Sequence, residues 1–177
     1  MKKVSILSAI VLSSLVIGVT SCKKEDPAKA LKVNLEQTAT VNGKILINAN
    51  ESDSLPKWSA PQNVQILASV PYNQLNSNAY GNYTINSVNY NPATGEFTVV
   101  APVGVNGSSI DIKIVDFKGT VITPVWVDTA YVNKTINVLW NGTSGNTPYL
   151  VPGEVYTLPT FELDGDYSVL PSVGDEI

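Results

Sequence analysis

Short stretches in which apolar and polar residues alternate run through most of the chain after residue 39, and they restrict the fold to β-structure. In the clearest stretch, Ile110, Ile112 and Ile114 are separated by Asp111 and Lys113. Successive side chains of a strand point to opposite faces, so this pattern indicates a strand with one buried face. No window keeps the 3.6-residue apolar period of an amphipathic helix, and glycines and prolines interrupt the chain at short intervals.

Several details of these stretches predict how the strands meet. The pattern of residues 83–90 changes phase near Ser87, which indicates a bulge, and Pro124 predicts an edge strand over 121–127 because proline has no backbone N–H. Residues 91–95 have turn composition, and Gly95 is suited to a positive φ. Further strands are expected at 41–47, 64–70, 97–101, 136–140, 155–158 and 167–170.

Many short antiparallel strands with turns between them are typical of a β-sandwich. The sequence therefore predicts an all-β fold: a single antiparallel sandwich of about 7–9 strands over residues 39–177. The part from Gly119 to Ile177 is expected to supply the last strands and a C-terminal extension.

The first residues have the pattern of an export signal. Lys2 and Lys3 precede an uncharged, apolar segment from Val4 to Val19, which is shorter than the roughly 20 residues of a spanning helix. A signal peptide over residues 1–21 is expected, and such a segment does not belong to the fold. The polar residues 22–38 are interpreted as a tether.

The end of this segment, Val19-Thr20-Ser21-Cys22, resembles the lipobox of bacterial lipoproteins. The resemblance implies cleavage before Cys22, the only cysteine, and acylation of its thiol. Each buried methylene contributes about 0.8 kcal/mol, so two or more acyl chains would hold the protein on a membrane. The alternative is an ordinary signal peptide followed by an unrelated thiol.

The residues after the cysteine bear on the location. Lys24, Glu25 and Asp26 resemble the export signal of some Gram-negative lipoproteins displayed on the outer face, and the alternative is a polar tether with no sorting role. The expected location is therefore the outer membrane, exposed at the surface, with the periplasmic face as the alternative.

Missing residue types exclude several function classes. The chain has no histidine, all 11 of its basic residues are lysines, and its net charge is −4. Histidine-dependent nucleophiles, imidazole metal clusters and guanidinium clamps are therefore absent, and a negative chain does not favour nucleic acid. The sequence predicts no enzyme, no catalytic residues, no cofactor and no nucleic-acid partner.

The stretch from Thr40 to Phe117 resembles the carboxypeptidase regulatory-domain-like, or transthyretin-like, β-sandwiches. The resemblance rests on Val41-Asn42-Gly43-Lys44-Ile45, on the entry Ala60-Pro61-Gln62-Asn63-Val64-Gln65-Ile66, on the hairpin Thr94-Gly95-Glu96-Phe97-Thr98-Val99 and on a strand that ends in an aromatic residue, Ile112-Lys113-Ile114-Val115-Asp116-Phe117. Asn63 stands where family members often have glycine. The resemblance implies a non-catalytic accessory or interaction module.

Aromatic residues in the expected loops are candidates for ligand binding. Exposed rings stack on sugar faces, and nearby asparagines donate and accept hydrogen bonds. The alternative is that such rings cover the seams between loops and core. Trp140, in phase with Ile136 and Val138, is expected in the core. The candidate ligand-binding aromatics are Trp58, Tyr72, Tyr80 and Trp126.

Two sets of carboxylates are also candidates. Glu162, Asp164 and Asp166 have an oxygen-rich spacing that suits calcium, although a full loop signature is missing, and a solvated turn is the alternative. A glycosidase would need two carboxyl groups facing one cleft; the spacing of Glu96 and Asp111 does not require that arrangement.

The leading hypothesis is a non-enzymatic envelope lipoprotein that acts as a binding or scaffolding module for envelope proteins or glycans. The alternatives are a carbohydrate-binding lipoprotein of a glycan-uptake system and a fimbrial or adhesive subunit. Two Asp-Ser/Thr-aliphatic triplets, at Ser54 and Thr129, resemble O-glycan acceptor sites and would have to be exposed.

Overall fold

The computed structural model describes residues 35–75, 78 and 80–171. All of these described residues belong to one compact unit. The expected signal peptide, the lipidation residue Cys22 and the export signal at Lys24, Glu25 and Asp26 lie outside the described residues. In the described part, no helix is long and apolar enough to cross a bilayer.

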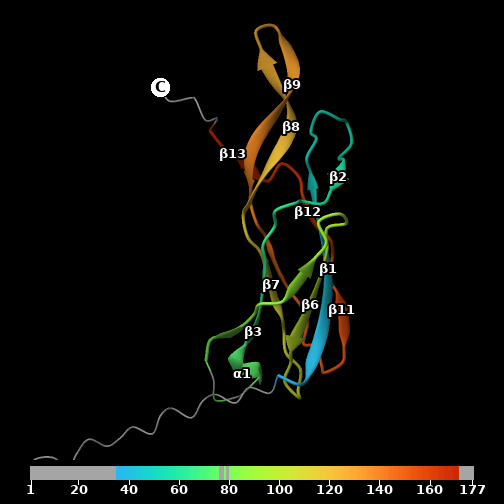
Figure 1. Cartoon of the computed structure of the whole chain (residues 1–177), viewed down its shortest axis with the longest axis vertical. Helices are drawn as coiled ribbons and strands as arrows, with labels where there is room; N and C mark the ends of the chain where they lie inside the picture. The colour runs from blue at the N-terminus through green and yellow to red at the C-terminus, as the bar shows by residue number, and fades with distance from the viewer. Residues whose placement is uncertain (1–34, 76–77, 79, 172–177) are drawn as a thin grey trace, which may run out of the picture. The chain divides into compact units, whose positions relative to one another are not determined.

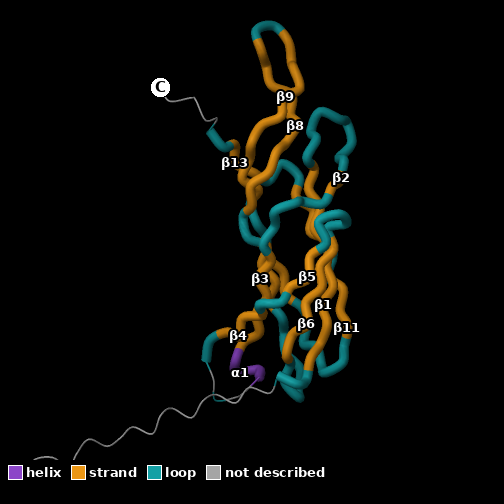
Figure 2. Tube along the Cα trace, viewed as in Figure 1, coloured by secondary structure: helices purple, strands orange, loops and turns teal. Residues whose placement is uncertain are grey.

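Nearly all of the regular secondary structure in the described chain is strand, and the predicted all-β fold is confirmed (Figure 2). A single helical turn, α1 (Tyr72–Leu75), interrupts the strands. The strands are β1 (Thr38–Asn48), β2 (Trp58–Ser59), β3 (Ile66–Pro71), β4 (Asn82–Ile85), β5 (Val88–Tyr90), β6 (Glu96–Pro102), β7 (Asp111–Ile114), β8 (Phe117–Val127), β9 (Ala130–Trp140), β10 (Ser144–Asn146), β11 (Val155–Thr157), β12 (Phe161–Leu163) and β13 (Tyr167–Val169).

The strands form three sheets, in which most neighbours are antiparallel (Figure 1). The first has the order β11-β1-β6-β5, and β12 and β2 also pair with β1. The second has the order β10-β7-β3-β4, and the third the order β13-β9-β8. β1 is the organising strand, because it pairs antiparallel with β6 and parallel with both β11 and β12.

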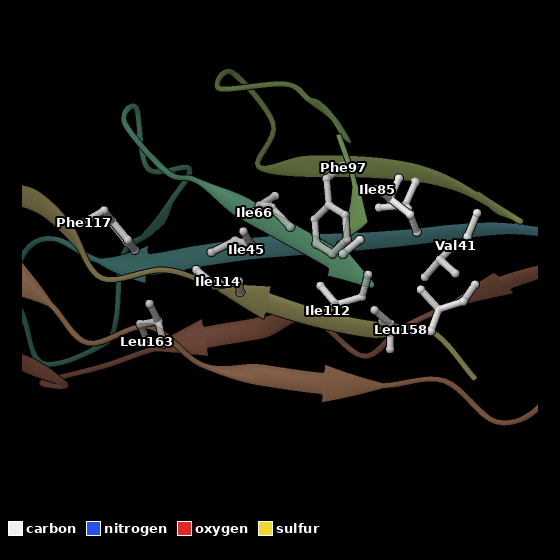
Figure 3. Packing of buried hydrophobic residues seen from close by; sticks show 14 of the residues in the cluster. Val41, Ile45, Ile66, Ile85, Phe97, Ile112, Ile114, Phe117, Leu158 and Leu163 are labelled. Atoms are coloured by element: carbon white, nitrogen blue, oxygen red, sulfur yellow. The ribbon is translucent and has the colours of Figure 1, made fainter. Parts of the chain in front are cut away.

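Most of the core lies between the inner faces of the first two sheets, and the base of the third sheet extends it through Phe117 and Trp140 (Figure 3). Val41, Ile45 and Phe97 project from the first sheet toward Ile112 and Ile114 of the second, and all five are almost completely buried. The β1 side chains alternate between buried and partly exposed. The alternation in the sequence therefore marks which face of each strand enters the core.

Two expected strands, residues 83–90 and the strand expected to end at Phe117, are wrong. In each, the chain passes from one sheet to another. Residues 83–90 do not form one bulged strand: β4 pairs with β3 in the second sheet, and β5 pairs with β6 in the first. The phase change near Ser87 marks the crossing. Likewise, β7 ends at Ile114, and Phe117 begins β8 in the third sheet. An alternation pattern shows the face of a strand and not its partner, so the crossings were missed.

The chain from Phe117 onward forms the hairpin of β8 and β9 and four short strands, of which β10, β11 and β12 join the first two sheets and β13 pairs with the hairpin. β8 and β9 pair over their full length, from Phe117↔Trp140 to Val127↔Ala130. Figure 1 shows the far end of this hairpin projecting beyond the neighbouring strands. Pro124 lies in β8 at the edge of its sheet, as predicted. The short elements β2, β10, β12 and α1 were not expected.

Candidate functional site

The projecting end of the β8–β9 hairpin, residues 122–135, is called the ribbon below. Its two strands are joined by Asp128 and Thr129, and Asp128 has a positive φ of 51°. β13 covers β9 only at Val138–Trp140, and an isolated bridge from Asn50 meets β8 only at Ile122. Among the described residues, no third strand pairs with the rest of the ribbon.

One face of the ribbon carries two exposed aromatic rings. Trp126 and Tyr131 are directly opposite across the hairpin. Their ring centroids are 5.0 Å apart at an interplanar angle of 73°, an edge-to-face pair. Trp126 is 58% exposed and Tyr131 is 70% exposed. The rings contact each other and leave most of their apolar surface in water.

The side of the ribbon opposite Trp126 and Tyr131 is the same side of the hairpin that packs into the core at its base. Directly opposite residues share a face, so the pairs Phe117–Trp140 and Val121–Ile136 lie on the same side as Val125–Val132. Val121 and Trp140 are fully buried, whereas Val132 is 47% exposed. The ribbon is therefore apolar on both faces near its tip.

The base of the ribbon is tied to the domain by Tyr167. Its ring packs edge-to-face on Trp140, with centroids 5.1 Å apart, and its hydroxyl donates a 2.8 Å hydrogen bond to the Glu51 carboxylate. Burial, the hydrogen bond and the negative charge of Glu51 raise the pKa of Tyr167 to about 12, against the lowering effect of a hydrogen bond with Thr123. The hydroxyl is therefore neutral at physiological pH and acts as a structural donor.

The aromatics singled out from the sequence do not form one platform. Trp58 lies opposite Asn48 at the end of β1 and is 37% exposed. Tyr72 begins α1 and packs edge-to-face on Tyr83, and Tyr80 is 95% exposed. α1 lies near the start of β1, because Gln74 lies beside Gly104 and the Val103 N–H donates to the Gln37 carbonyl just before β1. Trp58 pairs with the far end of β1, and 11 strand residues span about 35 Å, so these rings are too far apart to share one ligand.

Trp140 is completely buried, as predicted. Trp126 is the one singled-out residue that joins a second exposed ring. Tyr131 was not singled out, although a signal for it exists. Two runs of β-forming residues, 125–127 and 130–132, flank the Asp128-Thr129 turn, which is a hairpin pattern.

The suggested calcium ligands are held by separate partners. Asp164 accepts a 3.0 Å hydrogen bond from the Asn48 amide, and Asp166 accepts a 2.7 Å hydrogen bond from the Asn141 amide. Glu162 is exposed on β12. In the ranges that the structure describes, no three acidic side chains gather closely enough to hold a metal ion.

The two other carboxylates lie on different sheets. Glu96 begins β6 and accepts a 3.2 Å hydrogen bond from the Thr94 hydroxyl. Asp111 is on the outer face of the second sheet, where a groove of about 530 Å³ crosses the strands. Ser54 and Thr129, in the triplets that resemble O-glycan acceptors, are both exposed.

Polar side chains line the groove together with apolar surface from residues such as Leu67 and Ile112. Asn146, Asp111, Ser69 and Thr84 are aligned by the strand register into a single row across β10, β7, β3 and β4, with about 4.8 Å between neighbouring strands. Lys113 and Leu67 form a second row beside it.

Comparison with known proteins finds no matching family, no matching curated protein and no matching solved structure.

Proposed function

We propose that this chain is a non-enzymatic, lipid-anchored envelope protein whose β-sandwich binds a protein partner through the ribbon. The observation that carries the proposal is the exposed Trp126–Tyr131 pair on a projecting hairpin. Tryptophan and tyrosine are enriched among the residues that dominate binding energy at protein interfaces. Contiguous exposed apolar surface of this kind marks interaction sites in soluble domains.

The physical state of the ribbon supports the same proposal. A two-stranded hairpin by itself is at best marginally stable in water, and the ribbon exposes apolar side chains on both faces. Covering Trp126, Tyr131 and Val132 would remove this surface from water, at about 25 cal/mol per Å² of apolar area. A partner that covers the ribbon would therefore be favoured.

The anchor in this proposal comes from the sequence. The lipobox-like residues before Cys22 support acylation, and Lys24, Glu25 and Asp26 support display at the outer surface. The transthyretin-like resemblance of residues 40–117 supports an accessory role. Residues 23–37 would then separate the acyl chains from β1, and the ribbon would reach a partner in the same envelope.

The proposal predicts loss of binding when the ribbon loses its rings. A photo-reactive residue placed at Thr129, in the turn, is expected to form a discrete protein adduct in intact cells. Trp126→Ala and Tyr131→Ala are each expected to weaken that association about 30-fold, the effect of removing an interface residue worth about 2 kcal/mol. The measurement is the yield of the adduct for each variant, divided by the expression level of that variant.

The matched control is Tyr80→Ala. Tyr80 is even more exposed than Tyr131 but precedes Gly81, whose carbonyl accepts a hydrogen bond from Tyr72 at the start of α1, away from the ribbon, so its removal is expected to leave the adduct unchanged. Adduct formation that survives both ribbon variants, or that is lost equally with Tyr80→Ala, would contradict the proposal.

A second candidate function is carbohydrate binding, and the groove favours it. The row of Asn146, Asp111, Ser69 and Thr84 offers donors and acceptors at nearly the spacing of successive strands, and the exposed Leu67 beside it provides an apolar floor. An oligosaccharide lying across the strands would meet several hydrogen-bonding side chains at once.

This candidate predicts that the full chain is retained on neutral polysaccharides. Asp111→Ala is expected to weaken retention about tenfold, because a hydrogen bond to a charged group contributes roughly 1.5–3 kcal/mol. Lys118→Ala, an exposed change on β8 outside the groove, is the control. Affinity electrophoresis in polysaccharide gels measures both, and retention unaffected by Asp111→Ala would remove the groove from consideration.

A further inference from the structure

The two long edges of the ribbon differ in what their backbones offer. In β9, the Asn137 carbonyl accepts a 2.9 Å hydrogen bond from Leu170, and the Asn141 N–H donates to Asp166. Odd-numbered residues of β9 therefore turn their backbone groups away from β8. The direction of the backbone N–H and C=O groups alternates from one residue to the next along a strand. The N–H and C=O groups of Tyr131, Asn133 and Thr135 therefore face outward. No described residue pairs with them.

The β8 edge is different. Ile122 already exchanges hydrogen bonds with the chain at Ala49 and Glu51, at 2.9 and 2.8 Å. The next outward-facing residue is Pro124, which has no N–H to donate and protects an edge from pairing. Within the ribbon, two of the three outward-facing residues of β8 are thus occupied or blocked, whereas three consecutive outward-facing residues of β9 have no described pairing partner.

We propose that the β9 edge at Tyr131, Asn133 and Thr135 receives an extended strand from the partner protein, which pairs antiparallel to β9. This inference rests on the proposed function and specifies how the ribbon binds. β13 already pairs antiparallel with the same edge at Val138–Trp140, so the incoming strand would continue that ladder toward the tip. Strand addition supplies affinity through backbone hydrogen bonds and specificity through alternate side chains.

The side chains beside this edge define the chemistry of the incoming strand. Val132 and Lys134 lie on the face that continues the core, beside Val125 and Thr123. Residues directly opposite on neighbouring strands share a face. The strand is therefore expected to place an apolar residue opposite Val132 and an acidic residue opposite Lys134. In an antiparallel strand the acidic residue comes first, so the recognised pattern is acidic-x-apolar.

A second copy of this chain fits the edge less well. Two β9 strands related by a twofold axis at Asn133 would bring Thr129 of one copy opposite Asn137 of the other. Leu170 already occupies that position through its hydrogen bond to the Asn137 carbonyl. The turn would collide with Leu170 before the ladder was complete, which favours a strand from a different protein.

The decisive comparison is Asn133→Pro with Asn133→Ala. Both variants remove the same amide side chain, but only proline removes the outward N–H. The ribbon already accommodates Pro124 directly opposite Asn133, so the proline variant is expected to fold. Continued slow exchange of the Val132 and Lys134 amides, which face β8, verifies the hairpin in each variant.

The probe is a synthetic peptide, acetyl-Thr-Glu-Thr-Val-Thr-Val-amide, added to the full-length chain and followed by amide hydrogen exchange. The peptide is expected to slow exchange at Tyr131 and Thr135 about tenfold in the unmodified chain and in Asn133→Ala. In Asn133→Pro it is expected to have no effect. No slowing in any chain, or equal slowing in the alanine and proline variants, would overturn the inference.

Two further outcomes would also overturn it. Slow exchange at Tyr131 and Thr135 that develops with protein concentration alone would assign the edge to a second copy. Slow exchange in the free chain that is lost when residues 172–177 are deleted would assign it to the chain itself. If Trp126→Ala and Tyr131→Ala abolish the cellular adduct but Asn133→Pro does not, the proposed function stands and only strand addition fails.

Discussion

Replacing Trp140 by alanine is expected to lower the free energy of unfolding by about 4 kcal/mol, within the range for truncating a buried tryptophan. Trp140 is 0% exposed. It packs against Phe117 at a centroid distance of 6.4 Å and against Tyr167 at 5.1 Å. Its indole N–H has no hydrogen-bond partner in the described part of the chain, so its contribution comes from packing. Its loss would leave a cavity where the hairpin joins the core.

Denaturant unfolding of the full chain measures this effect, and Trp126→Ala is the matched control. Both variants remove a tryptophan from the same hairpin, but Trp126 is more than half exposed. Its truncation is expected to cost less than about 1 kcal/mol while weakening partner binding. Equal destabilisation by the two variants would show that the hairpin base is not packed as described.

Replacing Gly95 by alanine is expected to lower the free energy of unfolding by about 3 kcal/mol, for two reasons that add. Gly95 has a φ of 76°, in the left-handed region that disfavours a side chain. A Cβ at this position would also collide with the carbonyl oxygen of Ile45. The Gly95 carbonyl accepts a 2.9 Å hydrogen bond from the Ile45 N–H, so the turn is held against β1 and has little room to move.

Gly153→Ala separates the two causes. Gly153 has a similar φ of 85°, but nothing lies within 4 Å of an added Cβ. Gly153→Ala is therefore expected to lower the free energy of unfolding only through the unfavourable positive φ, by about 1–2 kcal/mol. Thermal or denaturant unfolding of both variants gives the comparison, and equal losses would mean that the contact between the turn and β1 contributes nothing.

Local features of the fold were predictable because they depend on neighbouring residues. The alternation at 110–114 identified β7 and its buried face. The 91–95 turn forms as expected, with the Gly95 N–H donating to the Asn91 carbonyl at 2.8 Å. Pro124 indicated an edge, and the backbone direction in β8 explains why: its missing N–H would face away from β9.

Features that depend on strand partners were not predictable. The crossings near Ser87 and between Ile114 and Phe117 separate segments whose side-chain patterns look continuous. Parallel pairing of β1 with β11 and β12 brings together residues more than 100 positions apart. The pairing of Trp126 with Tyr131 and the row of polar residues in the groove also require the register between strands.

The amino-acid sequence alone determined that this chain forms β-structure, which face of many strands is buried and where several turns lie. It also supplied the lipobox-like pattern at Cys22, because all of these features are written in adjacent residues. Only the tertiary structure decided which strands share a sheet, that one hairpin projects with apolar side chains on both faces, and that no described strand pairs with one of its edges. These properties depend on which distant strands compete for each edge, and a period of two residues carries no information about that competition.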